Sequence, residues 1–128
     1  MVFTMRSQLE PWTNKVVHVT GRVAGFGVGE LPGVRSKHVT ILLKDLEVVR
    51  DGKCIKLSHI WIMPSKRDVT TNLHVGDTVR FDANVYCYQK LTRDLKYVRS
   101  YGLKQIKHLY ILKPGDGKSY LDALAAIV

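Results

Sequence analysis

The chain has 128 residues, which is enough for one domain with a hydrophobic core and too few for two. Twenty Lys and Arg residues against eleven Asp and Glu residues give a net charge of +9, so we expect a polyanionic partner, nucleic acid ahead of an anionic membrane surface. A hydrophobic content of 45% argues against a disordered chain. The alternative for the charge is that it serves solubility alone.

Cysteine usage and the first residues bear on the compartment. Cys54 and Cys87 lie far apart in strand-like runs, without the CxxC or CxxH spacing of a zinc site. We predict that both are buried free thiols, as in a reducing cytosol. The start of the chain lacks the apolar core of a signal peptide, and no apolar run approaches the roughly 20 residues of a membrane span. We therefore expect a cytoplasmic protein without membrane association.

The first quarter of the chain predicts an arm, a strand and a loop. Residues 1–14 are mixed and contain helix and strand breakers, so we expect an arm. Residues 15–24 alternate between valines and polar side chains, which predicts the first strand. Gly21 lies in the apolar row of that strand and indicates a bulge or a sharp bend. Residues 25–37 contain four glycines and one proline and are predicted to form a loop.

The next segment predicts a hairpin. Residues 38–49 alternate as a second strand, and Asp51-Gly52 is a strong turn signal before a third strand over residues 53–63. The alternation of the third strand is imperfect. A bulge near Ser58-His59 would turn Trp61 outward, whereas an unbroken strand would place Trp61 in the core. Both alternatives stay open at this point.

The second half of the chain is dominated by the amphipathic stretch Leu73–Gln89. Before it, Ser65 is a candidate cap for one or two helical turns. Within it, alternate residues from Val79 to Cys87 form an apolar face, and the opposite face carries an arginine and two tyrosines. Residues 90–96 are a basic connection and residues 97–112 a last strand. A turn and a short apolar helix capped by Ser119 follow.

The order of elements predicts an all-β domain. Five strands with a short helix between the third and the fourth, and a short C-terminal helix, are the arrangement of an OB-fold, a five-stranded Greek-key barrel. We predict an arm over residues 1–14, the barrel over residues 15–112, and a C-terminal turn and helix over residues 113–128. A β-sandwich or another small barrel is the alternative.

Signals for catalysis are weak. The acidic residues and the five histidines are scattered through the chain, and no nucleophile elbow is present. Gly115–Ser119 resembles the end of a phosphate-binding loop but has Leu112 where that motif needs a glycine. The glycines of residues 25–29 lack the helix that a dinucleotide site requires. We expect no enzymatic activity, no cofactor and no metal; an OB-fold nuclease is the alternative from the enzyme class.

Binding signals are stronger. An OB-fold binds its ligand on the second and third strands and on two flanking loops, which here would be residues 25–37 and 89–97. Both segments are basic, and aromatic side chains lie nearby, so we expect phosphate contacts together with base stacking. The candidate nucleic-acid-binding residues are Phe26, Arg35, Lys37, Lys44, Lys56, Trp61, Arg80, Tyr86, Tyr88, Lys90, Arg93 and Lys96. Tyr97 and Tyr101 are further candidates for stacking. For each aromatic residue, packing within the protein is the alternative.

The stretch Leu73–Gln89 and the element order over residues 15–112 resemble the small single-stranded DNA-binding proteins of bacteria, phages and mobile elements. The resemblance implies single-stranded DNA binding in replication or recombination. The chain departs from the cellular bacterial form because it ends in the apolar segment 121–128 instead of a glycine-rich tail with an acidic tip. That segment predicts docking on the barrel itself or a homo-oligomer. RNA binding and a protein-interaction subunit of a larger assembly are the alternatives.

Overall fold

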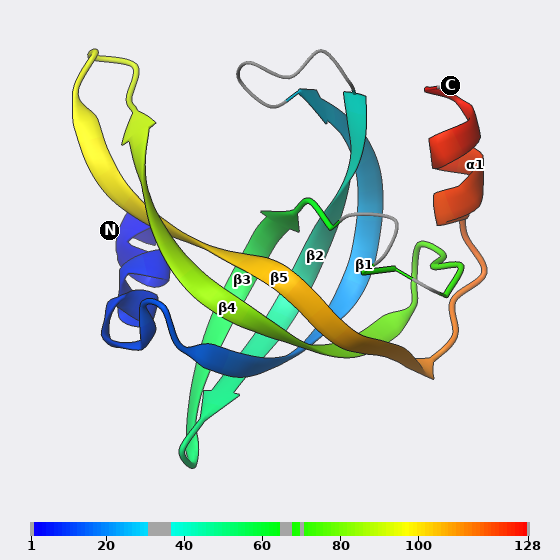
Figure 1. The fold of residues 1–128 in the computed structure, drawn as a ribbon, viewed down its shortest axis with the longest axis horizontal. Helices are drawn as coiled ribbons and strands as arrows, with labels where there is room; N and C mark the ends of the chain where they lie inside the picture. The colour runs from blue at the N-terminus through cyan, green and yellow to red at the C-terminus, as the bar shows by residue number, and fades with distance from the viewer. Residues whose placement is uncertain (1, 31–36, 65–67, 70, 128) are drawn as a thin grey trace.

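A computed structural model describes residues 2–30, 37–64, 68–69 and 71–127. The strands are β1 (Val16–Glu30), β2 (Lys37–Arg50), β3 (Lys53–Ile62), β4 (Thr78–Leu91) and β5 (Tyr97–Lys113). A 3-10 segment, η1 (Val2–Trp12), precedes them, and a short helix, α1 (Tyr120–Ala125), follows. The all-β prediction and the short C-terminal helix are confirmed (Figure 1).

All five strands form one antiparallel sheet in the order β3-β2-β1-β4-β5. The central strand β1 pairs with β2 along most of its length and with β4 through its first half, residues 16–22. The two edge strands β3 and β5 also contact each other, so the sheet curls around its apolar side. Figure 1 shows the long, strongly curved strands that this arrangement requires.

A bend in β1 and β2 gives the sheet much of its curvature. The register between these strands shifts next to Gly21, and Asp45 of β2 has a positive φ of 54°. A Cβ added at Gly21 would lie 3.2 Å from Cγ of Leu46, so the glycine makes room for a core leucine. The bend that Gly21 predicts is therefore present.

The structure resolves the two alternatives for β3. Its pairing with β2 runs without a register shift, so the predicted bulge near Ser58-His59 is absent from the β2–β3 ladder. Both residues are nevertheless exposed between buried Leu57 and Ile60, because β3 bends together with β2. As a result Trp61 lies on the outer face and not in the core.

One predicted connection is wrong in its described part, and the short helix predicted in a second is not confirmed. Residues 25–30 continue β1 and are not loop, because Phe26 pairs with Ile41 and packs on the core. Between β3 and β4, residues 64, 68–69 and 71–77 form no helix; Leu73 is buried and His74 makes a bridge to Ser119. The predicted cap Ser65 lies outside the described residues.

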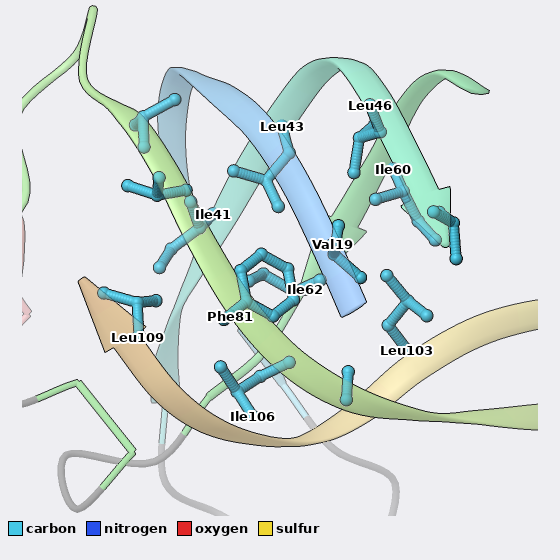
Figure 2. Packing of buried hydrophobic residues seen from close by; sticks show 14 of the residues in the cluster. Val19, Ile41, Leu43, Leu46, Ile60, Ile62, Phe81, Leu103, Ile106 and Leu109 are labelled. Carbon is cyan, nitrogen blue, oxygen red and sulfur yellow. The ribbon is translucent and has the colours of Figure 1, made fainter. Parts of the chain in front are cut away.

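The core draws on every element of the sheet. Phe81 of β4 lies among Val19, Ile41, Ile62 and Ile106, which come from the other four strands (Figure 2). The apolar face predicted for β4 is buried from Val79 to Val85. Leu9 and Trp12 of η1 and Tyr120 and Ala123 of α1 complete the same core. The C-terminal segment therefore packs on the core of its own chain, which agrees with one of the two predicted alternatives.

The cysteine prediction is confirmed in one respect and wrong in another. Cys54 and Cys87 are free thiols, but both are exposed. Cys54 faces away from the core near the β2–β3 turn, and Cys87 lies on β4 beyond Asn84, the last residue of that strand that pairs with β1. Alternation places Cys87 on the apolar side of β4, but its side chain is exposed.

A buried carboxylate joins two distant connections. The Asp77 side chain is 1% exposed and accepts backbone N–H bonds from His74 (2.8 Å) and from Gly115. The close approach of Gly76 and Gly115 makes this arrangement possible, since a side chain at Gly115 would overlap the Gly76 backbone. This Asp77 clasp fixes the entry to β4 against the segment that follows β5.

Candidate nucleic-acid interface

Strand pairing arranges the outer face of the sheet, the side away from the core, in lateral rows. Gly25 of β1, Leu42 of β2 and Trp61 of β3 form one row. Arg22, Lys44 and His59 form the next row, also one residue from each strand. We call these two rows the tryptophan face, since Trp61 is its largest exposed side chain.

The glycines of β1 determine how Trp61 lies. A Cβ added at Gly27 would be 3.2 Å from Cζ3 of the indole and 2.9 Å from Oγ1 of Thr40, so the ring lies against bare backbone. At Gly25 an added Cβ would meet nothing within 4 Å. Trp61 is 48% exposed, and Met63 beside it is also exposed. The tryptophan face thus presents an accessible aromatic ring next to open backbone.

Basic side chains lie in the row next to that of the Trp61 indole. Lys44 and His59 are exposed, and the Arg22 guanidinium lies 3.1 Å from the Asp45 carboxylate. Both partners of that ion pair are largely exposed, and such pairs contribute little to stability because water and salt screen them. Arg22 can therefore exchange the carboxylate for a phosphate at little cost.

The second cluster of candidate residues lies on the hairpin arm, which we define as residues 86–104 of β4 and β5. Among the described strands, none besides β4 and β5 pairs with this segment, and Figure 1 shows it projecting from the sheet. Tyr86 and Tyr88 have ring centroids 5.4 Å apart. Tyr86 lies against Gly102, and Nζ of Lys104 is 5.3 Å from the Tyr86 centroid.

The arm is strongly basic. Its cationic residues are Lys90, Arg93, Lys96, Arg99 and Lys104, and all are exposed, whereas Asp94 is its one acidic residue. Thr92 holds the turn: its backbone N–H donates to the Lys96 carbonyl (2.8 Å), and its hydroxyl donates to Asp94. The exposed apolar residues of the arm are Leu91, Leu95, Tyr97 and Val98.

Three further residues meet on the outer face between these two clusters. Nδ1 of His18 lies 2.6 Å from one carboxylate oxygen of Asp82, and Nδ1 of His108 lies 2.8 Å from the other. Hydrogen bonds from His18, then from His108, lower the pKa of Asp82 below its ordinary value. Arg80 precedes this group on β4, and Lys107 of β5 pairs with Asp82.

Most of the predicted site residues fall on these surfaces. Lys44 and Trp61 belong to the tryptophan face, Arg80 lies between the clusters, and the candidates from Tyr86 to Lys96 lie on the arm. Lys56 is exposed on β3, paired with Glu47 and away from Trp61. Whether these residues bind a ligand stays a prediction.

Two aromatic candidates pack within the protein, and the side chains of two basic candidates are not described. Phe26 is half-buried and packs edge-on against Tyr120, with ring centroids 5.9 Å apart and an interplanar angle of 64°. Tyr101 is buried in the core. Arg35 lies outside the described residues, and of Lys37 the structure describes the backbone pairing with Glu30.

Sequence reasoning missed Arg22, His59, Lys104 and the two histidines at Asp82. Alternation puts Arg22 on the outer face of β1, so a signal existed for it. The meeting of His18 with His108 depends on a bulge in β5 that periodicity does not reveal.

Comparisons of the chain with protein-family models, curated protein sequences and solved structures gave no match. Within the described residues, no group of three or more His, Cys, Asp or Glu side chains is placed to hold a metal ion. In the same part of the chain, no helix has the length and apolar character to cross a membrane. The chemistry of the outer face is therefore the basis for assigning a function.

Proposed function

We propose that this chain is a non-enzymatic protein that binds single-stranded nucleic acid, with single-stranded DNA as the leading ligand, on an OB-type barrel. The spatial order β3-β2-β1-β4 supports the barrel, because it is the order of a Greek key. Contact between the edge strands β3 and β5 supports a partly open barrel of five strands, as an OB-fold has.

The observation that carries the proposal is the exposed indole of Trp61 beside Lys44 and Arg22. Large aromatic side chains are usually buried for most of their area, so a tryptophan that is 48% exposed on a sheet points to a binding role. Stacking an unpaired base on an aromatic ring contributes about 1–3 kcal/mol, whatever the base. Bases inside a duplex are not available to stack in this way, which favours single strands.

Cations would position the phosphate backbone of the strand. From Trp61 the outer face leads through Lys44 and Arg22 to Arg80, and from there to the hairpin arm. Paired tyrosines and five cations on the arm offer the same combination of stacking and charge as the tryptophan face. Base-stacking platforms joined by a basic track bind single strands with little sequence preference.

Titration of fluorescently labelled oligo-dT tests the proposal, because a label on the DNA reports binding both in wild type and in a variant that lacks Trp61. We expect log K to fall linearly with log salt. Trp61→Ala should weaken binding about 5- to 150-fold, the equivalent of one stacked base. Leu121→Ala removes an exposed apolar side chain of α1 and serves as the matched control.

Affinity that is absent or independent of salt contradicts the proposal, as does a Trp61→Ala variant that binds like wild type. The same titration with single-stranded RNA and with duplex DNA decides between the ligand classes. Tighter binding to RNA would make the chain an RNA-binding module of the same fold.

A protein-interaction subunit remains the second candidate, favoured by the exposed apolar residues of the hairpin arm. Leu91, Leu95, Tyr97 and Val98 lie together near its tip. Exposed apolar patches on a soluble domain often mark protein contacts. This function would be preferred if the titrations show no nucleic-acid affinity.

A further inference from the structure

His18, Asp82 and His108 come from three neighbouring strands. His18 of β1 pairs directly with Asp82 of β4. His108 lies in β5 where the register with β4 shifts, and its φ is +55°. Histidine is one of the few residues found repeatedly in this left-handed conformation. The bulge turns the imidazole of His108 toward Asp82, on the side opposite His18.

The hydrogen bonds to Asp82 determine which nitrogen of each imidazole carries the proton and which nitrogen is left for a ligand. An ionised carboxylate only accepts hydrogen bonds, so Nδ1 of each ring carries the proton and donates. The distances are 2.6 Å for His18 and 2.8 Å for His108. Nε2, across the ring, remains for another partner. The side chains are 55% and 76% exposed, so a ligand on the outer face can reach both rings.

The charge of this group depends on pH. With both imidazoles neutral, the group carries the single negative charge of Asp82. Each proton taken up at Nε2 adds one positive charge, so the doubly protonated group carries +1. Histidine is the side chain that ordinarily gains its proton between about pH 8 and 5.

The surroundings are mainly cationic. The charged or titratable residues on the adjoining parts of the outer face are Lys15 and Arg22 in or before β1, Asp45, Glu47 and Arg50 of β2, Cys54 and Lys56 of β3, Arg80 of β4, and Lys104, Lys107 and Tyr110 of β5. Asp82 is therefore a negative point on a basic surface when the histidines are neutral. Protonation removes that interruption between Arg80 and the hairpin arm.

We propose that His18 and His108 form a phosphate site for the bound nucleic-acid strand, and that protonation of the two imidazoles switches it on. The inference rests on the proposed function, since the phosphate belongs to the phosphodiester backbone of that strand. Two Nε2–H donors with positive charge would bind the phosphate oxygens by charge-assisted hydrogen bonds. The same two rings, when neutral, leave the carboxylate charge uncompensated.

Binding of fluorescently labelled oligo-dT at about pH 7.5 and about pH 5.5, at constant ionic strength, tests the site. Wild type should gain about fivefold in affinity at the lower pH, as expected for two exposed charge contacts. The His18→Gln/His108→Gln variant should lose most of this gain in affinity between the two pH values. His74→Gln, in the connection before β4, is the matched control and should keep the gain.

A second measurement needs no variant. The imidazole resonances of His18 and His108 are titrated by NMR with and without saturating oligo-dT. Because linkage is reciprocal, a strand that binds the protonated rings more tightly must raise their pKa, whereas a merely structural His-Asp contact would not respond to the strand.

The outcomes distinguish failure of the proposed function from failure of the phosphate site alone. Absence of binding at both pH values overturns the proposed function itself. Binding at about pH 7.5 with an equal pH response in wild type and the double variant overturns the phosphate site and leaves the function standing. Unchanged imidazole titrations in the presence of oligo-dT overturn the phosphate site as well.

Discussion

At Gly115 a Cβ would lie 2.4 Å from the carbonyl carbon of Gly76, whereas a Cβ at Gly25 would meet nothing within 4 Å. The two glycines therefore respond in opposite ways to alanine. Gly115→Ala should lower the free energy of unfolding by about 1–3 kcal/mol, because backbone has to move and the Asp77 clasp loosens. Gly25→Ala should raise it by about 0.4–1 kcal/mol, because the unfolded chain loses freedom.

Urea denaturation followed by circular dichroism measures both glycine variants under identical conditions. Equal effects at the two positions would contradict the packing described around Gly115.

Asp82 also has a measurable effect on stability. Its folded pKa is lowered by the hydrogen bonds from His18 and His108, so its contribution is present above the ordinary value of 3.8 and is lost as the pH falls below it. Asp82→Asn should lower the free energy of unfolding by about 1 kcal/mol near neutral pH, as for other partly exposed pairs.

Urea titrations of wild type and Asp82→Asn at about pH 6 and about pH 3 follow this difference, which should narrow at the lower pH. A difference of the same size at both values would show that the carboxylate charge is not the cause.

At the scale of elements, the hairpin arm makes a prediction about salt. Each cation of the arm that neutralises a phosphate contributes about −0.7 to the slope of log K against log salt for a single strand. Lys90→Gln, Arg93→Gln and Lys96→Gln combined should therefore reduce the magnitude of the slope by about 2.

The control for the arm variant is Lys53→Gln with Lys118→Gln, which removes exposed charges outside the arm and the tryptophan face. A slope unchanged by the triple substitution would remove the arm from the interface, even if the protein binds single strands.

The alternation of apolar and polar residues predicted the strands well where one face of the strand is buried and the other is exposed to solvent. It gave the all-β class, the β2–β3 hairpin with its Asp51-Gly52 turn, and the core face of β4 from Val79 to Val85. The prediction of a loop at residues 25–30 was wrong. Glycine has a low strand propensity, but these residues pair with β2 because Phe26 packs against the core and holds the strand in place.

The candidate site was predictable only in its separate parts. Trp61 and the basic residues of the arm could be identified from the sequence. Their neighbours across the sheet could not, because the rows depend on register, and register shifts at bulges in β1, β2 and β5. Asp45 and His108 adopt positive φ values at two of these bends although neither residue is a glycine.

For the whole molecule, a chain with a net charge of +9 folds into one curved five-stranded sheet, and much of its apolar C-terminal segment packs on the core of that sheet. Tyr120 and Ala123 are buried against the core, and Ser119 caps α1 by accepting a hydrogen bond from the Asp122 N–H (3.1 Å). Leu121 is the large apolar side chain of α1 that remains exposed. A homo-oligomer through this segment stays a prediction, with a smaller surface than the sequence suggests.

The Asp77 clasp has a consequence for the order of events during synthesis. The ladders among β1, β2, β3 and β4 use residues that leave the ribosome before Gly115, which follows the last strand, β5. Until Gly115 emerges, the Asp77 carboxylate lacks one of its two backbone donors, and a buried carboxylate without its donors is costly. The clasp can therefore close only after β5 and the segment that follows it have been synthesised.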